Sequence, residues 1–143
     1  MISPLTFSRP VRFEEVDAAG IVFFARYLHI CHDAMEAVFD PLPGGYRALI
    51  MERRIGFPAV HTDCDYSAPL RYGDIVRVDT KVVRVGTTSV TFAFTLVRTR
   101  DEAVAAKITH VTVVCSLDTM EKTPIPDDVR AVLTPLLTSV VAS

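Results

Sequence analysis

The sequence has 143 residues, half of them hydrophobic and 22% charged, with a formal net charge of −2. This length and composition suit a single domain, residues 1–143, with its own core, and they exclude an intrinsically disordered chain. The small net charge gives no reason to expect a nucleic-acid partner, and no apolar stretch is long enough to span a membrane.

The chain is predicted to begin with a strand over residues 8–16, in which Glu14 and Glu15 are interpreted as solvated charges. Residues 25–39, ARYLHICHDAMEAVF, then carry apolar side chains at helical spacing and on most sides of the helix. This pattern predicts a long helix that is buried over most of its circumference. After the turn signal PLPGG, a second, amphipathic helix is predicted over residues 45–55.

Four strands are predicted in the rest of the chain, because β-branched and aromatic residues recur there between turn-like joints. They span residues 57–69, 75–85, 89–99 and 103–117. The joints at 86–88 and 98–103 are short, so the last three strands are expected to form an antiparallel meander. A short helix over residues 127–137 is also expected, disturbed by Pro135.

The order of these elements indicates the fold class. One long apolar helix followed by about five strands predicts an α+β fold in which an antiparallel sheet is laid around the helix. A curved sheet of this size leaves flanks to cover, so we expect a homodimer.

The cysteines and the N-terminal segment indicate the cell compartment. Cys31, Cys64 and Cys115 are scattered within apolar segments, which indicates buried, reduced thiols and a cytoplasmic protein. The segment MISPLTFSRP lacks the basic and apolar regions of a signal peptide, so none is expected. Neither a CxxC pair nor an HExxH motif is present, so no metal site or other cofactor is predicted.

One block of the sequence resembles a known family. VRFEEVDAAGIVFFARYL, residues 11–28, is similar to the start of hotdog-fold acyl-CoA thioesterases of the 4-hydroxybenzoyl-CoA thioesterase type and of their Tol-Pal-associated relatives. The matching positions are Asp17, Ala18, Ala19, Gly20, Val22, Phe23, Phe24 and Tyr27. DCDYSAPLRYGD, residues 63–74, resembles the second strand and turn of the family, so the likeness covers about residues 8–118.

The resemblance implies a fold, an assembly and a reaction. It implies a hotdog fold with the sheet wrapped around the long central helix, and a dimer with active sites at the subunit interface, often assembled as a dimer of dimers. Asp17 falls on the catalytic aspartate of the family. Phe24 falls where a backbone N–H binds the thioester oxygen. The implied substrate is an acyl-CoA with a small to medium acyl group, aromatic or short-chain.

The chemistry of thioester hydrolysis fits these residue types. A helix N-terminus offers free N–H donors and a partial positive charge to the developing oxyanion. A carboxylate beside it, Asp17, could act as nucleophile or as general base, and the sequence leaves both open. Gly20 lets the backbone approach the substrate closely. Val22, Phe23 and Tyr27 could form an apolar wall for the acyl group.

Histidines are the next candidates for substrate contacts. His32 is either an ordinary helix histidine or a contact for the acyl group. Strand alternation places His61 on one face with Ala59 and Asp63, where it serves either the acyl pocket or an interface. His110 is interpreted as a core or interface residue and His29 as exposed.

Basic residues should gather near the pocket mouth to bind the phosphates of CoA. The benzoyl-type relatives carry a basic cluster after the third strand, where this chain has GTT at 86–88. Arg71, Lys81 and Arg84 are the candidate CoA contacts, or else ordinary surface cations. The departure leaves open a different nucleotide pose, weaker CoA affinity or an acyl-carrier-protein substrate.

Two other functions compete with a thioesterase. A non-catalytic acyl or acyl-CoA binding module of the same fold would not need the carboxylate, so the intact Asp17 argues against it. A hotdog dehydratase would carry an essential histidine before a Pro/Gly-rich stretch. No histidine follows Asp17 until His29, so that class is disfavoured.

Overall fold

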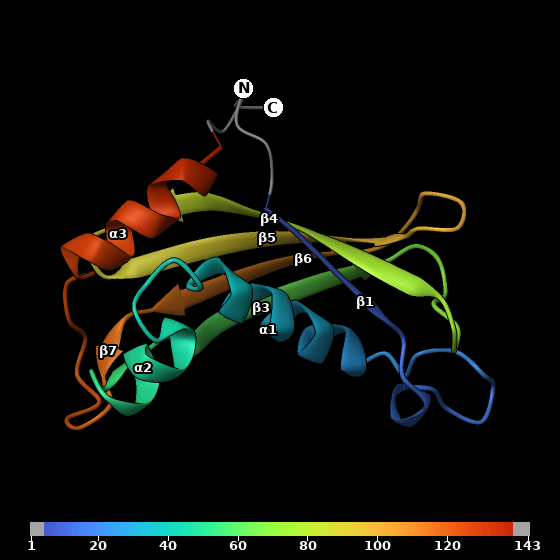
Figure 1. Cartoon of the computed structure of the whole chain (residues 1–143), viewed down its shortest axis with the longest axis horizontal. Helices are drawn as coiled ribbons and strands as arrows, with labels where there is room; N and C mark the ends of the chain where they lie inside the picture. Colours follow the sequence, from blue (N-terminus) through green and yellow to red (C-terminus); the bar gives the residue numbers. More distant parts are fainter. Residues whose placement is uncertain (1–4, 139–143) are drawn as a thin grey trace.

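The computed structural model describes residues 5–138 of the chain. Its main sheet is antiparallel and five-stranded, with strand order β1-β4-β5-β6-β3. The strands are β1 Leu5–Pro10, β3 Ala59–Tyr66, β4 Ile75–Val85, β5 Ser89–Arg98 and β6 Ala103–Val113. Helix α1, Arg26–Val38, lies across one face of this curved sheet (Figure 1). The expected α+β arrangement of one long helix against five antiparallel strands is confirmed.

Smaller elements close the two ends of the sheet. They are 3-10 helices η1 Phe13–Glu15 and η2 Thr134–Leu136, helices α2 Gly45–Met51 and α3 Asp127–Leu133, and strands β2 Ile55–Gly56 and β7 Cys115–Ser116. The short strands β2 and β7 pair with each other beside α2, and α3 contacts β4 (Figure 1). No helix among residues 5–138 is both long and apolar enough to cross a membrane.

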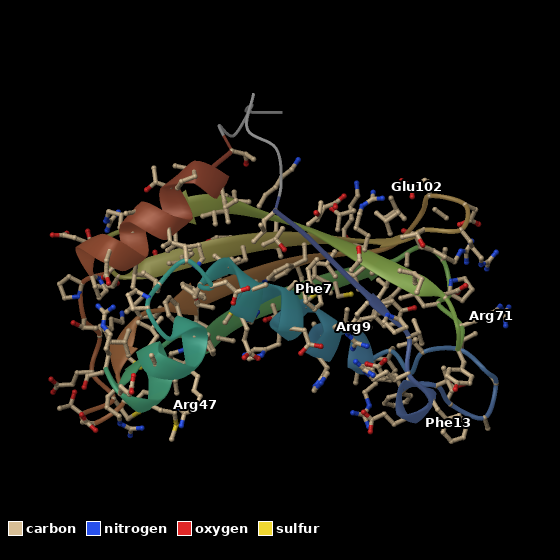
Figure 2. The ribbon with its side chains drawn as sticks, viewed as in Figure 1. Phe7, Arg9, Phe13, Arg47, Arg71 and Glu102 are labelled. Carbon is tan, nitrogen blue, oxygen red and sulfur yellow. The ribbon has the colours of Figure 1, made fainter. Side chains whose placement is uncertain are left out.

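The first strand differs from its prediction. It ends at Pro10, and residues 13–15 form a 3-10 helix, where a strand over 8–16 was expected. The cause is Glu15, which turns inward to pair with Arg9 of β1 and is only 3% exposed. Interpreting Glu15 as a solvated charge was therefore wrong. Figure 2 shows Arg9 on β1 and Phe13 in the short helix that follows the end of this strand.

Two other predicted boundaries change for local reasons. The helix expected over 45–55 ends at Met51, and Gly56 lies in β2 opposite Cys115. A Cβ atom at Gly56 would lie 2.5 Å from a methyl group of Leu117, so a larger residue there would have to displace the end of that side chain. The strand expected over 103–117 divides into β6 and β7.

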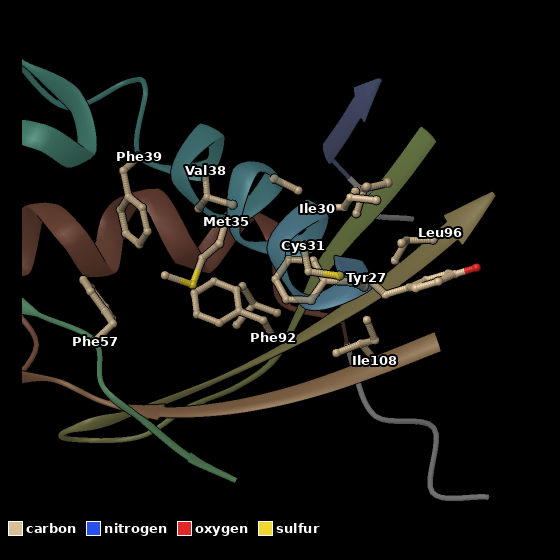
Figure 3. Packing of buried hydrophobic residues seen from close by; sticks show 14 of the residues in the cluster. Tyr27, Ile30, Cys31, Met35, Val38, Phe39, Phe57, Phe92, Leu96 and Ile108 are labelled. Carbon is tan, nitrogen blue, oxygen red and sulfur yellow. The ribbon is translucent and has the colours of Figure 1, made fainter. Parts of the chain in front are cut away.

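The core lies between α1 and the inner face of the sheet. Alternate residues of the central strands are buried: Val76, Val78 and Val82 of β4, and Val90, Phe92, Phe94 and Leu96 of β5. They pack against Ile30, Ala34 and Met35 of α1 (Figure 3). Burial of each large apolar side chain contributes roughly 1.5–3 kcal/mol to stability. This packing fixes the position of the first turn of α1, beside which the candidate site lies.

Candidate active site

Asp17 lies in a tight turn before α1. Its N–H donates to the carbonyl of Ile21 at 2.9 Å, and its own carbonyl accepts from the Gly20 N–H at 2.9 Å. Gly20 has a φ of +82°, a left-handed conformation that favours glycine. One carboxylate oxygen of Asp17 accepts from the Ala19 N–H at 2.8 Å. The other oxygen makes no hydrogen bond to residues 5–138, so it is free to react.

The chain after this turn leads directly into α1. The Phe23 N–H donates to the carbonyl of Glu15, and the Arg26 N–H donates to the carbonyl of Phe23. Between them, the Phe24 N–H has no acceptor in the described part of the chain. Its location just before the first turn of the helix adds the partial positive charge of the helix N-terminus. The Tyr66 hydroxyl donates to the Phe24 carbonyl at 2.7 Å and holds this peptide in place.

Asp17 and the start of α1 line one open pocket with a volume of about 460 Å³. The lining residues are Asp17, Ile21, Val22, Phe23, Phe24, Tyr27, Tyr66, Ser67, Ala68 and Pro69. The structure thus brings together Asp17, Val22, Phe23, Phe24 and Tyr27 from the sequence-based candidates, with Gly20 in the turn beside them. The segment from Tyr66 to Pro69 was missed, because only the fold brings it to this pocket.

The two tyrosines of the pocket act as neutral groups. Tyr27 is buried, its hydroxyl accepts from the Leu70 N–H at 3.3 Å, and its ring meets that of Tyr66 edge to face at 4.9 Å. Burial raises the pKa of Tyr27, and burial together with a hydrogen bond to Cys64 raises the pKa of Tyr66 to about 12. Both hydroxyls therefore stay protonated near neutral pH and orient other groups without transferring protons.

A second, smaller cavity lies one helical turn further along α1. It has a volume of about 70 Å³ and is lined by Leu28, Cys31, His32, Met35, Thr62, Phe94, Ile108 and His110. The Thr62 hydroxyl and Nδ1 of His110 are 2.8 Å apart and hydrogen-bonded. Burial, helped by the nearby His32, lowers the pKa of His110, so its imidazole is neutral at pH 7. His32, a candidate from the sequence, thus lines this cavity together with Thr62, which no sequence pattern indicated.

His61 does not reach either cavity within this chain. A β-bulge between Ala59 and His61 shifts the register against β6, so Ala59 and His61 no longer share a face. His61 is 65% exposed on the outer face, 3.3 Å from Asp63, while Thr62 faces α1. Within one chain, His61 therefore faces away from both cavities, on the same face as Asp63. A contact of His61 with the acyl pocket of a second copy stays a prediction, as does an interface role.

The three candidate CoA contacts, Arg71, Lys81 and Arg84, do not lie together in the structure. Arg71 pairs with Ile21 in a β-bridge and so lies beside the Asp17 pocket. Lys81 and Arg84 are exposed on β4, and Lys81 is six residues beyond Ile75, a span of about 20 Å along a strand. The single chain therefore does not bring Lys81 and Arg84 to Arg71.

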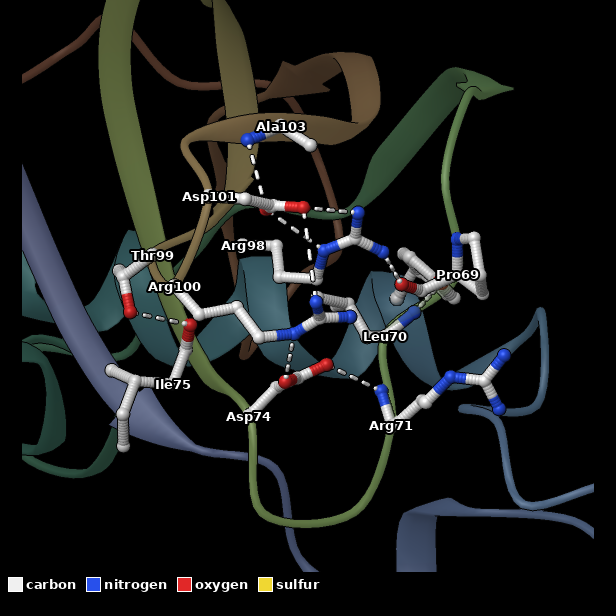
Figure 4. Close-up of polar contacts among 11 residues, drawn as sticks. Pro69, Leu70, Arg71, Asp74, Ile75, Arg98, Thr99, Arg100, Asp101 and Ala103 are labelled. Atoms are coloured by element: carbon white, nitrogen blue, oxygen red, sulfur yellow. Dashed lines mark hydrogen bonds and ion pairs between the residues drawn. The ribbon is translucent and has the colours of Figure 1, made fainter.

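Hydrogen bonds fix the turn that carries Arg71. The carboxylate of Asp74 accepts from the Arg71 N–H at 2.9 Å and from Nε of Arg100 at 2.8 Å, and Arg98 donates to the Pro69 carbonyl at 2.7 Å. Figure 4 shows these bonds converging on the turn after β3. The guanidinium of Arg71 points away from them and forms no ion pair with the residues that the structure describes.

The chain is similar to known thioesterases. The profile of the thioesterase-like superfamily matches residues 11–133. The 1,4-dihydroxy-2-naphthoyl-CoA hydrolase of Synechococcus elongatus is 30% identical over 122 residues, 85% of this chain and 88% of that protein. The structure of a 1,4-dihydroxy-2-naphthoyl-CoA thioesterase from Synechocystis superposes with a TM-score of 0.81 at 22% identity, covering 90% of this chain and 94% of that one. A gentisyl-coenzyme A thioesterase superposes with a TM-score of 0.78 at 25% identity, covering 91% and 99%.

Proposed function

This chain belongs to the thioesterase-like superfamily and is a thioester hydrolase with the hotdog fold, and from that premise we propose that it hydrolyses aromatic acyl-CoA thioesters. The observation that carries the proposal is that Asp17 and Phe24, which lies two residues before α1, line one pocket, and that the Phe24 N–H has no acceptor among the described residues. Thioester hydrolysis needs these two groups together: a carboxylate to attack or to activate water, and a donor for the oxyanion.

In the proposed reaction the thioester carbonyl oxygen accepts from the Phe24 N–H, which stabilises the charge that develops there. Asp17 can then act in two ways. It either attacks the carbonyl carbon, giving the CoA thiolate and an acyl anhydride that water then hydrolyses, or takes a proton from a water that attacks the same carbon and displaces the CoA thiolate. Rapid-quench mass spectrometry supports the first route where it detects a covalent acyl-enzyme, because such a species forms only in that route.

The acyl group is proposed to lie between α1 and β3. Tyr66, Cys64 and Thr62 are successive inward-facing residues of β3, and they connect the Asp17 pocket to the small histidine-lined cavity over roughly 13 Å of strand. His32, Thr62 and His110 at its far end are polar groups in an otherwise apolar site, which suits a ring hydroxyl. The substrates in the names of two relatives, 1,4-dihydroxy-2-naphthoyl-CoA and gentisyl-CoA, carry hydroxylated aromatic acyl groups, which supports this substrate class.

A homodimer and its assembly into dimers of dimers are part of the proposal. Strand β3 is at the edge of the main sheet, and its outer side pairs with no strand among residues 5–138. Val60 of this strand is 60% exposed, and Leu28 on α1 is 43% exposed. An unpaired edge beside exposed apolar side chains suits a second copy. Light scattering should give at least twice the monomer mass, and a monomer would overturn this part.

The free thiols support a reducing compartment. Cys31 and Cys115 are buried, Cys64 is half-buried, and none of the three forms a disulfide. We propose a cytoplasmic location on this ground.

The test is thiol release from a panel of aromatic, short-chain and long-chain acyl-CoAs and one acyl-carrier-protein thioester. Asp17→Asn should lose about 100-fold or more in kcat. Phe24→Tyr should stay within a few-fold of wild type, because the backbone donor remains. Asp118→Asn, at an exposed carboxylate far from the pocket, is the matched control. No turnover on the panel would overturn the function, and an unaffected Asp17→Asn enzyme would overturn the mechanism.

A further inference from the structure

Two exposed aromatic rings lie together beside the candidate active site. Phe13 of η1 is 74% exposed and Tyr72 is 63% exposed, and their rings meet edge to face at 5.7 Å. Each ring leaves much of its surface open to solvent. Adjacent exposed aromatic residues are typical of a recognition surface. The two rings are hereafter called the aromatic platform.

The backbone that carries each ring of the platform is anchored by buried or backbone contacts. Phe13 begins the 3-10 helix that the buried Arg9–Glu15 ion pair fixes to β1. Tyr72 lies in a turn whose ends are joined by the hydrogen bond from the Asp74 N–H to the Arg71 carbonyl at 3.0 Å. A ligand would therefore meet two rings on a backbone that is already positioned, which limits the entropy lost on binding.

Two arginines adjoin the platform in the sequence. Arg12 precedes Phe13 and Arg71 precedes Tyr72, and both are exposed. Neither guanidinium forms an ion pair with residues 5–138, whereas Arg53, Arg77 and Arg98 all pair with carboxylates. In Figure 2, Phe13 and Arg71 lie at the same end of the molecule, far from Arg47. Unpaired arginines next in sequence to two exposed rings match a ligand that combines a flat ring with phosphates.

The platform adjoins the pocket. Arg71 pairs with Ile21, which lines the Asp17 pocket, so Tyr72 lies one residue beyond the pocket wall. Segment 86–88, GTT, has no basic residue to hold a nucleotide. We propose that the platform binds the adenine nucleotide of CoA, with the purine stacked on Tyr72 and in edge contact with Phe13, and phosphates on Arg12 and Arg71; this inference rests on the proposed function. The pantetheine arm would run from there into the pocket.

The test compares acyl-CoA with the matching acyl-pantetheine thioester, which has no nucleotide. Stacking of one base on an aromatic side chain contributes enough affinity to change binding about fivefold or more. Tyr72→Ala and Phe13→Ala should each raise the ratio of the acyl-CoA KM to the acyl-pantetheine KM by about that factor. Tyr72→Phe, which keeps the ring, should restore the ratio. Arg71→Gln should also raise it, and Arg47→Gln, at an exposed arginine of α2, should not.

A binding measurement separates this inference from the reaction itself. Adenosine 3′,5′-bisphosphate should bind the wild type in calorimetry, and Tyr72→Ala should weaken it about fivefold or more. An unchanged KM ratio with unchanged nucleotide binding would overturn the inference. A fall in oligomeric mass for Tyr72→Ala would also overturn it, because the platform would then be an interface between copies. Nucleotide binding without turnover would instead overturn only the proposed function.

Discussion

Arg9 and Glu15 form a buried ion pair beneath the turn that carries Asp17. Arg9 Nη1 donates to Glu15 Oε1 at 2.8 Å, and Nη2 contacts the second oxygen. The Arg12 N–H also donates to Glu15 at 2.8 Å, and Arg9 Nε lies 3.1 Å from a carboxylate oxygen of Asp33 on α1. One charged cluster thus joins β1, η1 and α1 directly before the catalytic candidate.

We predict that Glu15→Gln destabilises the fold by about 3 kcal/mol, because breaking a buried pair leaves the charge of Arg9 without its main partner. The control is Arg53→Gln, which breaks the exposed pair with Asp128 and should change stability by less than about 1 kcal/mol. Urea unfolding monitored by circular dichroism measures both. Equal effects of the two substitutions would contradict a structural role for the buried pair.

Stability should also fall at acidic pH through Glu15. Burial raises the pKa of Glu15, but the hydrogen bonds from Arg9 and Arg12 and the charge of Arg9 outweigh it, so the net pKa is lowered. A lowered pKa in the folded state adds stability above the unfolded value of about 4.3. This contribution is lost as the pH falls from there through the folded pKa. Glu15→Gln should therefore lose less stability than wild type over this range, as unfolding at a series of pH values would show.

Much of the fold could be predicted because its periodicities are local. The alternation of Val76, Val78 and Val82 identifies the buried face of β4, and helical spacing identifies α1. Glu15 was misjudged because its partner Arg9 becomes a neighbour only once the chain turns at Pro10. The Arg9–Glu15 contact exists only because of this turn, so no local sequence pattern predicts it.

Part of the candidate site could likewise be predicted from the sequence, and part of it could not. Asp17 and Phe24 belong to one contiguous block, so the sequence alone could propose them. Tyr66 and Thr62 come from a strand some forty residues later, and the bulge in β3 decides which of its residues face α1. Alternation groups His61 with Asp63 and Thr62 with Cys64, but it does not say which of the two faces meets α1, so Thr62 could not be proposed from the strand alone.

Two buried threonines should respond oppositely to the same substitution. The Thr80 hydroxyl is buried without a hydrogen-bond partner among residues 5–138, whereas the Thr112 hydroxyl donates to the Val90 carbonyl at 2.9 Å. Thr80→Val should stabilise the fold by about 1 kcal/mol, because a methyl group of similar shape replaces a buried hydroxyl that has no hydrogen-bond partner. Thr112→Val should destabilise it by about 1 kcal/mol. Thermal unfolding of the two variants gives the signs, and a loss of stability in Thr80→Val would contradict this reading.

The last prediction concerns Tyr66 as a positioning residue for the start of α1. Tyr66→Phe removes the hydrogen bond to the Phe24 carbonyl and should lower kcat about three- to tenfold, the equivalent of one ordinary hydrogen bond. Stability should change by less than about 1 kcal/mol, because Tyr66 is half exposed. Tyr46→Phe is the matched control, since its hydroxyl makes no hydrogen bond in the described chain. With the pKa of Tyr66 at about 12, its hydroxyl stays protonated. The kcat ratio of wild type to Tyr66→Phe should then be constant from pH 6 to pH 9, and a ratio that varies with pH would show that Tyr66 transfers a proton instead.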